Sequence, residues 1–496
     1  MSTIRDVYRP SLATLTDLYE LTMAAGYVDA GIADREAVFN LTFRARPFHG
    51  GYAVAAGLAD AIELLDTLRF APEDIDHLAA QRTAAGTPLF TPDFLDRLAT
   101  FRFSGDVDAI PEGTVVFPHE PLVRVRGPLI EAQLAETMLL TIIGFQTLVA
   151  TKAARIVDAA DGDPVLEFGL RRAQGVDGGL SVSRAAWIGG VAATSNVLAG
   201  RLFGIPVRGT HAHSWVQAFG DEQVAFDAYA DAMPANVVLL VDTYDTLNGV
   251  KRAIETGQRL RAQGHDLAAI RIDSGDLAYL SIEARKLLDA AGFESTRIIA
   301  SNDLDEGVIS SLKGQGARID TWGVGTRLAT CYDQPALGAV YKLTAIREDD
   351  GTWRYPIKLS DQLEKVSVPG ILGVRRYIGA DGRFRADAIY DEALGVDDGD
   401  TIICPWNLLK RREIDGEHTI EELLQPVLRD GDRVAPAPSL DDIRARTRAQ
   451  LDALHPTIRR LLNPHEYPVG LEERVHERRT DLALAAKGQR RPRRAA

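Results

Sequence analysis

The sequence is poor in cysteine, with only Cys331 and Cys404 among 496 residues. Two cysteines cannot build a disulfide framework, and their spacing matches no zinc site, so we expect a reducing compartment. The N-terminus lacks a charged-then-apolar signal pattern, and no stretch of eighteen consecutive apolar residues occurs. These absences predict a cytoplasmic protein that does not bind a membrane.

An excess of positive charge is also missing. The chain has 56 lysines and arginines against 70 aspartates and glutamates, for a formal net charge of −14. A general nucleic-acid binder would carry a basic footprint, so this class is excluded. Anions must then be bound locally, by particular arginines and backbone N–H groups. The basic stretch AAKGQRRPRRAA at residues 485–496 is interpreted as a solubilising tail.

Hydrophobic periodicity predicts a protein of α/β plus α+β class. Between residues 164 and 330, apolar runs alternate with helical stretches, which implies parallel strands joined by crossovers. The segment is short for an eight-unit barrel of about 250 residues, so we expect an irregular, six-stranded parallel α/β barrel. The candidate strands are PVLEFG, IPVRGTHA, NVVLLVDT, AAIRIDSG, RIIASND and DTWGVG.

The remainder of the chain predicts an antiparallel-sheet domain of the open-faced sandwich type beside the barrel, with terminal helices. The expected order is an N-terminal helical segment that contributes to the active site at 1–35, the antiparallel-sheet α+β domain at 36–130, the barrel at 131–334, strands that return to the sheet domain at 335–440, and C-terminal helices with the basic tail at 441–496.

Each apolar run from residue 165 onward ends in a polar cluster. Because the carboxyl ends of parallel strands form one edge of a sheet, these clusters predict a shared pocket. Arg171 and Arg271 offer donors for a carboxylate or phosphate, whereas for Arg172 we favour a structural salt bridge to Glu167 or Asp273. Four aspartates could bind ribose hydroxyls or hold Mg²⁺ through a diphosphate, although most isolated aspartates cap helices: Asp242, Asp245, Asp273 and Asp276.

The stretch GTHAHSW, residues 209–215, sets two histidines two positions apart. If the chain is extended there, His211 and His213 point to the same side. They could be two metal ligands, one reactive imidazole beside a bystander, or an ordinary strand end. No other histidine follows a later strand of 164–330 to complete a metal site, which makes the metal hypothesis the weaker one. Periodicity alone does not choose between the two histidines.

Six motifs, taken in order, resemble one family: the nicotinate phosphoribosyltransferases, which belong to the type II group with the nicotinamide and quinolinate enzymes. The motifs run from residue 16 to residue 330 and are TDLYELTMAAGY, EFGLRRAQG, TSNVLAGRLFGIPVRGTHAHSWV, RIDSGDL, SNDLDE and WGVGTRLAT. VYKL and KLS extend the likeness toward residue 360. The ordered set is far more specific than any single motif.

The resemblance implies transfer of phosphoribose from 5-phosphoribosyl-1-diphosphate to nicotinate, which gives nicotinate mononucleotide for NAD synthesis. It implies coupling to ATP hydrolysis through a phosphohistidine, and the family's GT-x-AH motif selects His213 over His211. Mg²⁺ would accompany the diphosphate and ATP. The enzyme would be a homodimer in which Tyr19 crosses the interface.

The resemblance also assigns the remaining contacts. Tyr19 and Phe168 would sandwich the pyridine ring, and Arg271 with Thr210 would hold the nicotinate carboxylate. The other expected contacts are Arg171 to that carboxylate or the 5-phosphate, catalytic Asp273 and Asn302 to the ribose and the diphosphate with Mg²⁺, and Gly323, Gly325 and Thr326 to the 5-phosphate.

Base specificity has its own signal at Ser195 and Asn196, where nicotinamide-using relatives carry an acid. An acid would repel the nicotinate carboxylate and neutral groups would not, so we expect nicotinate to be preferred over nicotinamide. Three rival functions are a metal-dependent α/β-barrel hydrolase using the H-x-H pair, a quinolinate phosphoribosyltransferase and a non-catalytic binding protein.

Overall fold

The computed structural model describes residues 12–395, 401–407 and 410–488. The chain divides into two compact units: the first is Met1–Thr147 with Ala336–Ala496, and the second is Leu148–Pro335. The division at Leu148 falls inside the long helix α7 (Glu136–Ala160). Residues 489–496 of the predicted basic tail lie outside the described residues.

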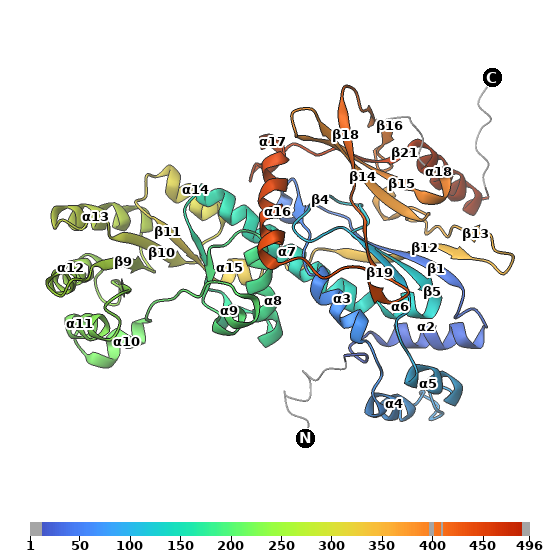
Figure 1. The fold of residues 1–496 in the computed structure, drawn as a ribbon, viewed down its shortest axis with the longest axis horizontal. Coiled ribbons are helices and arrows are strands. Elements are labelled where there is room, and N and C mark those ends of the chain that lie inside the picture. Colours follow the sequence, from blue (N-terminus) through green and yellow to red (C-terminus); the bar gives the residue numbers. More distant parts are fainter. Residues whose placement is uncertain (1–11, 396–400, 408–409, 489–496) are drawn as a thin grey trace. The chain divides into compact units, whose positions relative to one another are not determined.

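The second unit is built on a six-stranded parallel sheet in the order β7-β6-β11-β10-β9-β8. Within residues 148–335, all of which are described, β7 and β8 are edge strands, so the curled sheet is a half-barrel (Figure 1). This confirms the predicted irregular parallel barrel. Its strands are β6 (Val165–Glu167), β7 (Ala193–Thr194), β8 (Val237–Leu240), β9 (Leu267–Ile272), β10 (Arg297–Asn302) and β11 (Thr321–Val324).

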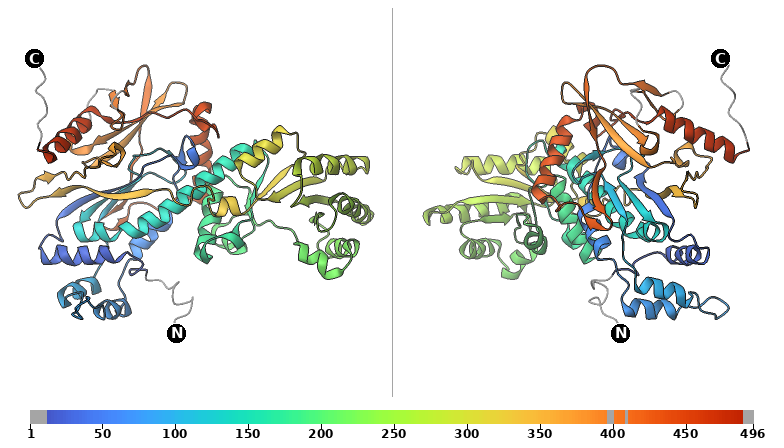
Figure 2. Two further views of the ribbon diagram at one scale, coloured as in Figure 1. Left: turned by 180° about the vertical axis from the view of Figure 1, so that it is seen from behind. Right: turned by 45° about the vertical axis from the view of Figure 1, so that its right-hand side comes forward.

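Helices cover the outside of this sheet, as the green and yellow ribbons show in Figure 2. The strands can therefore be apolar on both faces, and all four residues of β8 are buried. Asp245, Asp276 and Asp305 each accept a backbone N–H at the start of the next helix, which fixes where strand turns into helix. The helices are α8 (Gly175–Ile188), α9 (Val197–Phe203), α10 (His213–Phe219), α11 (Glu222–Ala232), α12 (Thr246–Ala262), α13 (Leu277–Ala290), α14 (Glu306–Gly314) and α15 (Thr326–Ala329).

One predicted strand, IPVRGTHA, is wrong. The segment forms only an isolated bridge between Val207 and Thr194, and α10 already begins at His213. Pro206 has no N–H to donate to a ladder, which limits strand pairing here. The short strand β7 occupies the edge of the sheet instead, and the two histidines do not share a strand face.

The first unit contains a seven-stranded antiparallel sheet in the order β13-β12-β1-β5-β3-β19-β20. Strand β12 pairs with β1, so chain from beyond residue 335 completes the sheet that begins at residue 36. The strands are β1 (Glu36–Phe43), β3 (Asp106–Ala109), β5 (Val123–Pro128), β12 (Ala339–Arg347), β13 (Trp353–Arg354), β19 (Gln425–Arg429) and β20 (Asp432–Arg433).

A second, six-stranded sheet in this unit was not expected from the sequence. Its order is β17-β16-β21-β15-β14-β18. Among the described strands of this sheet, only β15 and β21 pair in parallel. Strands after residue 335 thus contribute to two sheets. The second sheet comprises β14 (Leu372–Gly379), β15 (Phe384–Asp391), β16 (Thr401–Ile403), β17 (Arg411–Glu413), β18 (His418–Glu422) and β21 (Val469–Glu472).

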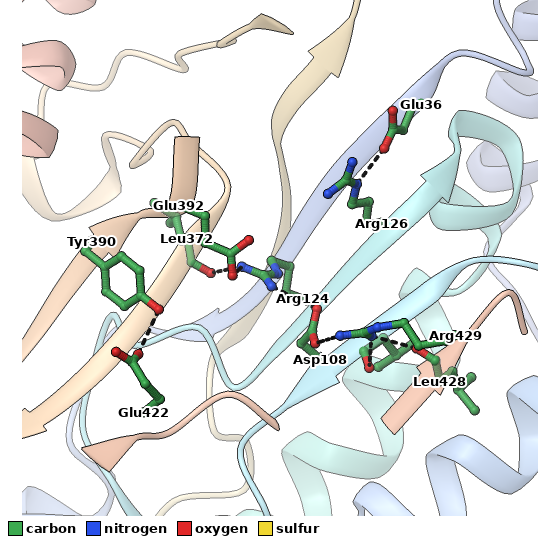
Figure 3. Close-up of polar contacts among 11 residues, drawn as sticks. Glu36, Asp108, Arg124, Arg126, Leu372, Tyr390, Glu392, Glu422, Leu428 and Arg429 are labelled. Atoms are coloured by element: carbon green, nitrogen blue, oxygen red, sulfur yellow. Dashed lines mark hydrogen bonds and ion pairs between the residues drawn. The ribbon is translucent and has the colours of Figure 1, made fainter. Parts of the chain in front are cut away.

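Arg124 joins the two sheets (Figure 3). From β5 its buried guanidinium donates 2.9 Å to the Leu372 carbonyl of β14 and pairs with Asp108 at 2.8 Å and Glu392 at 2.7 Å. Removing one partner of a buried ion pair typically costs about 3–5 kcal/mol. These contacts therefore fix the second sheet against the first.

Helices α2 and α6 pack together in the first unit, and α6 packs on β1. The stretch Leu129–Ala160, which includes α7, is long and apolar enough to cross a membrane, with a mean hydropathy of 1.5 over 18 residues. Because 67% of that window is buried inside the protein, it equally fits a core helix and is weak support for a membrane span. The other elements are α2 (Leu18–Asp29), β2 (Ala53–Val54), α3 (Leu58–Thr67), α4 (Pro72–Ala79), α5 (Pro92–Ala99), β4 (Val115–Val116), α6 (Leu129–Leu134), α16 (Leu440–Ala453), α17 (Pro456–Arg459) and α18 (Glu473–Ala486).

The α2–α6 packing buries Glu20, whose carboxylate accepts 2.7 Å from the Gln133 side chain. Burial, with a smaller contribution from the charge of Glu136, raises the pKa of Glu20 from 4.5 to about 7. The folded state therefore binds this proton more tightly than the unfolded state. This carboxyl makes the free energy of unfolding fall as pH rises from about 4.5 to about 7.

We predict that the Tm of the wild type, measured against that of Glu20→Gln, falls as pH rises from about 5 to about 8, because only the wild type titrates at this position. Thermal unfolding followed by circular dichroism at several pH values measures the difference. Glu63→Gln, at an exposed position on α3, is the matched control. A Tm difference for Glu20→Gln that stays constant across this range would contradict the prediction.

Candidate active site

The carboxyl ends of the parallel strands meet around Arg271 of β9. Its Nε donates to Ser301 Oγ at 2.7 Å, Nη1 to Thr210 Oγ1 at 2.9 Å and Nη2 to Asp273 Oδ1 at 3.2 Å. The guanidinium carbon lies 5.8 Å from the centre of the Phe168 ring. With a side chain only 14% exposed, Arg271 connects four segments that are distant in the sequence.

Two aspartates lie beside this guanidinium. The backbone N–H of Asp273 donates 2.8 Å to Asp242 Oδ2, which also accepts 2.6 Å from the Ser274 hydroxyl. Ser301 donates its hydroxyl to Asp273. Asp242 Oδ1 is buried and has no hydrogen-bond partner among the described residues. The predicted site residues Thr210, Arg271 and Asp273 are thus brought together.

His213 is the first residue of α10 and its side chain is 39% exposed. Its Nδ1 lies 3.1 Å from Thr243 Oγ1, and its Nε2 lies 3.8 Å from Asp273 Oδ2. One ring nitrogen is therefore held by a hydroxyl while the other faces a carboxylate. An imidazole that is oriented and accessible in this way can act as a nucleophile or as a general acid–base.

His211 has a different environment. Its Nε2 accepts 3.1 Å from the Leu240 backbone N–H, its Nδ1 lies 3.3 Å from the Ala212 carbonyl, and its ring packs edge-on against Tyr229. Burial lowers its pKa, and the charges of Arg271 and His213 lower it further. The hypothesis that both histidines share one face is wrong, because this segment is a loop and His211 points into the core.

This geometry also argues against the H-x-H metal site. Both ring nitrogens of His211 have backbone partners, so His211 cannot join His213 on one ion without breaking them. Across the described part of the chain, no group of three or more His, Cys, Asp or Glu side chains is placed to hold a metal. Asp242 and Asp273 offer only oxygen ligands. Mg²⁺ prefers such ligands and often binds to carboxylates together with phosphate groups.

Phe168 and Gly323 form an apolar wall. A Cβ built on Gly323 would lie 2.8 Å from a ring carbon of Phe168, so only glycine lets this ring lie over β11. Asn302, at the end of β10, has a φ of 125°, which is strained for a side-chain-bearing residue. Gly325 and Thr326 follow β11 at the same edge of the sheet.

Glu167 is a residue whose role the sequence did not reveal. Its fully buried carboxylate accepts from the Gly169 N–H, from Ser183 Oγ at 3.0 Å and from Thr194 Oγ1 at 2.5 Å. Arg172 is exposed and forms no ion pair with Glu167 or Asp273 within residues 148–335, so the favoured salt bridge is wrong. An acidic residue inside an apolar strand was the available signal.

Asn196 is 3% exposed and caps α9. Its Oδ1 accepts 3.2 Å from the Ala199 N–H, and its Nδ2 donates to the Gly179 carbonyl and Ser183 Oγ, both at 3.2 Å. The side-chain amide of Asn196 therefore has a structural role. Ser195 is half-buried beside it, and the specificity role of this pair stays a prediction.

The remaining predicted residues are not hydrogen-bond partners of Arg271. Arg171 is exposed in a short 3₁₀ turn, η2 (Leu170–Arg172). Tyr19 belongs to the first unit, where its side chain on α2 is 46% exposed and its hydroxyl donates 2.8 Å to Glu136. Asp245 and Asp276 are helix caps, as expected of isolated aspartates.

The comparisons with known proteins agree with one another. The sequence matches the nicotinate phosphoribosyltransferase (NAPRTase) N-terminal domain over residues 14–144, the NAPRTase family over 164–354 and the NAPRTase C-terminal domain over 373–479. It is 44% identical to nicotinate phosphoribosyltransferase of Bacillus subtilis (strain 168), over 94% of this chain and 96% of the relative, and 36% identical to that of Caenorhabditis elegans, over 93% and 92%.

The fold is similar to the crystal structure of human nicotinic acid phosphoribosyltransferase, with a TM-score of 0.81 and 32% identity over 94% of this chain and 99% of that one. The nicotinate-nucleotide pyrophosphorylase of Pyrococcus furiosus, at 21% identity and a TM-score of 0.67, shares the fold; the match covers 91% of this chain and 97% of that one. The chain therefore belongs to the nicotinate phosphoribosyltransferase family.

Proposed function

We propose that the protein transfers phosphoribose from 5-phosphoribosyl-1-diphosphate to the ring nitrogen of nicotinate, releasing diphosphate and forming nicotinate mononucleotide for NAD synthesis. The observation that carries the proposal is the Arg271 network, because it sets a fixed cation beside an aromatic ring and two carboxylates. The names of the relatives supply the substrates.

Nicotinate is a flat ring with one carboxylate. Phe168 offers the ring face, while Arg271 and the Thr210 hydroxyl offer donors for the carboxylate. Ser301 and Thr210 hold the guanidinium in place, so little ordering remains to be done when the anion binds. The rival hydrolase has no comparable support.

Phosphoribosyl transfer breaks the anomeric C–O bond and forms a C–N bond, and positive charge develops on the ribose. Asp242 and Asp273, which lie next to one another, would supply the negative charge that stabilises this cation. Mg²⁺, when bound, neutralises the leaving diphosphate. We assign the ribose and diphosphate to Asp273 and Asn302, with Arg171 near the nicotinate carboxylate or the 5-phosphate. The backbone of Gly323 and Gly325, with Thr326, would receive the 5-phosphate.

We further propose that ATP hydrolysis is coupled to this reaction through His213. Thr243 holds Nδ1, which leaves Nε2 as the nucleophile. Nε2 would attack the γ-phosphorus of ATP, so that an N–P bond forms as the bond to ADP breaks, and water would later release the phosphate. The Nδ1 proton would stay on the ring, donated to Thr243 Oγ1, so that Nε2 carries the free lone pair. Asp273, 3.8 Å from Nε2, would stabilise the positive charge that forms on the ring as the N–P bond forms.

A homodimer is part of the proposal. Two segments expose apolar side chains that a second copy would cover: Leu15, Leu18, Tyr19 and Met23 in and before α2, and Val197, Leu198 and Leu202 on α9. Tyr19 would then stack on nicotinate in the partner's site. A reducing cytoplasm suits Cys331 and Cys404, which are both free thiols.

The phosphohistidine is tested by incubating the protein with ATP labelled at the γ-phosphate. We predict a base-stable, acid-labile label that is absent from His213→Ala, because that variant lacks the nucleophile. His211→Gln, which keeps an acceptor for the Leu240 N–H, is the matched control and should retain the label. Label on His213→Ala would refute the assignment.

Base preference is tested by steady-state assays with nicotinate and nicotinamide. We predict that kcat/KM favours nicotinate by at least about tenfold, because only the acid completes a charge-assisted pair with Arg271. Arg271→Gln should lose most of this preference, whereas Arg172→Gln, an exposed neighbour outside the network, should keep it. Equal use of both bases by the wild type would overturn the prediction.

The shared dimer site is tested by mixing two inactive variants, Tyr19→Ala and His213→Ala, after mild dissociation. A mixed dimer has one site with both defects and one intact site, so we predict recovery of about a quarter of wild-type activity at equal mixing. Mixing each variant with itself is the control. Activity that never recovers while mixed dimers form would show that Tyr19 serves its own chain.

A further inference from the structure

A second cavity lies in the first unit, wholly apart from the Arg271 network in the chain. Its volume is about 850 Å³, within the range of small-molecule sites. It is formed by the turn after β1, by residues 117–119, by strands β16, β17 and β21, and by the residues just before β21. Its lining is rich in cations and in flat rings: Arg44, Arg46, Trp406, Lys410, Arg411 and Arg412 are among them.

The charges of this cavity are only partly neutralised. Lys410 pairs with Glu466, and Arg411 pairs with Glu473 at 3.2 Å. Arg46 and Arg412 have no carboxylate partner among the described residues, and Nη1 of Arg46 is buried without a hydrogen-bond partner. A buried cationic donor without a partner is costly, and a bound anion would remove that cost.

The same cavity offers an aromatic surface. Trp406 stacks on His119 with ring centres 3.7 Å apart and planes inclined by 25°. Burial, with a smaller contribution from the charges of Arg479 and Arg44, lowers the pKa of His119 to about 4, so the imidazole is a neutral ring at pH 7. A phosphate alone would leave this platform and most of the volume unused.

We propose that this cavity is a second ligand site that binds a nucleotide, with its phosphate on Arg46 and Arg412 and its base against the Trp406–His119 pair. Guanidinium groups suit phosphate because they donate two parallel hydrogen bonds, and an indole suits the face of any base. The lining residues of this site belong to the first unit, and none of them is part of the Arg271 network.

The test is calorimetric titration of the full chain with AMP and with nicotinate mononucleotide, one purine and one pyridine nucleotide. Each titration is made on the wild type and on Arg271→Gln, which disables the barrel-end network. We expect binding of at least one nucleotide to persist in Arg271→Gln. In that background, Arg46→Gln and Arg412→Gln should each weaken the Kd by at least about tenfold, and Arg46→Lys should weaken it less.

Two controls separate the parts of the proposal. Arg411→Gln removes a cation of the same cavity that is already paired with Glu473, so it should change the Kd by less than about twofold. Trp406→Leu should weaken nucleotide binding by about tenfold while leaving inorganic phosphate binding unchanged. The Tm of each variant verifies folding.

Three results would overturn the proposal: no nucleotide binding beyond the barrel, binding that survives both Arg46→Gln and Arg412→Gln, or inorganic phosphate that binds as tightly as either nucleotide. None of these results depends on the label at His213. A failure here and a failure of the proposed transfer reaction are therefore distinguishable.

Discussion

The active-site end of the half-barrel depends on one buried cation, the Arg271 guanidinium. A guanidinium that is 14% exposed must find hydrogen-bond acceptors and opposite charge nearby, or its burial would be strongly unfavourable. Thr210, Ser301 and Asp273 supply these from three other points of the chain. The ends of β9 and β10 and the loop of Thr210 are thereby linked to the position of one charge. A substrate carboxylate would meet donors that are already oriented.

Glu167 is a buried anion with a similar role, since it also connects several segments through hydrogen bonds. It gathers the Gly169 N–H and the hydroxyls of Ser183 and Thr194, and so holds the chain as it leaves β6 and β7. Phe168 follows Glu167 directly, and its ring can lie over β11 only because residue 323 is glycine. A fully buried acid therefore positions the aromatic wall of the site. We regard Glu167 as a positioning residue.

The sequence predicted what strand periodicity and chain order determine. Five of the six expected barrel strands are present, and Arg271 meets Ser301 because parallel strands align their carboxyl ends. Thr210 reaches Arg271 from a loop. Hydrogen-bond partners were less predictable. The apolar run before His211 suggested a strand, but no strand forms there. Pro206 has no N–H to donate to a neighbouring strand, and His211 is buried, where its ring accepts the Leu240 N–H. The second sheet escaped prediction because the contacts that fix it against the first sheet, from Arg124 to the Leu372 carbonyl and to Glu392, join residues far apart in the sequence that no local pattern reveals.

Net charge is a poor guide to where this protein binds anions. The whole chain carries −14, yet both proposed sites contain arginines: Arg271, 5.8 Å from the Phe168 ring, in one unit, and Arg46 and Arg412, which line the same cavity as Trp406, in the other. The difference lies in how the cations are compensated. The guanidinium of Arg271 is paired with Asp273, so an incoming anion must compete with this carboxylate for the guanidinium. Arg46 has a buried donor without a partner, and a bound anion gains that donor without breaking a contact. The arrangement at Arg271 therefore favours exchange of Asp273 for another anion during turnover. The arrangement at Arg46 favours simple binding of a phosphorylated ligand.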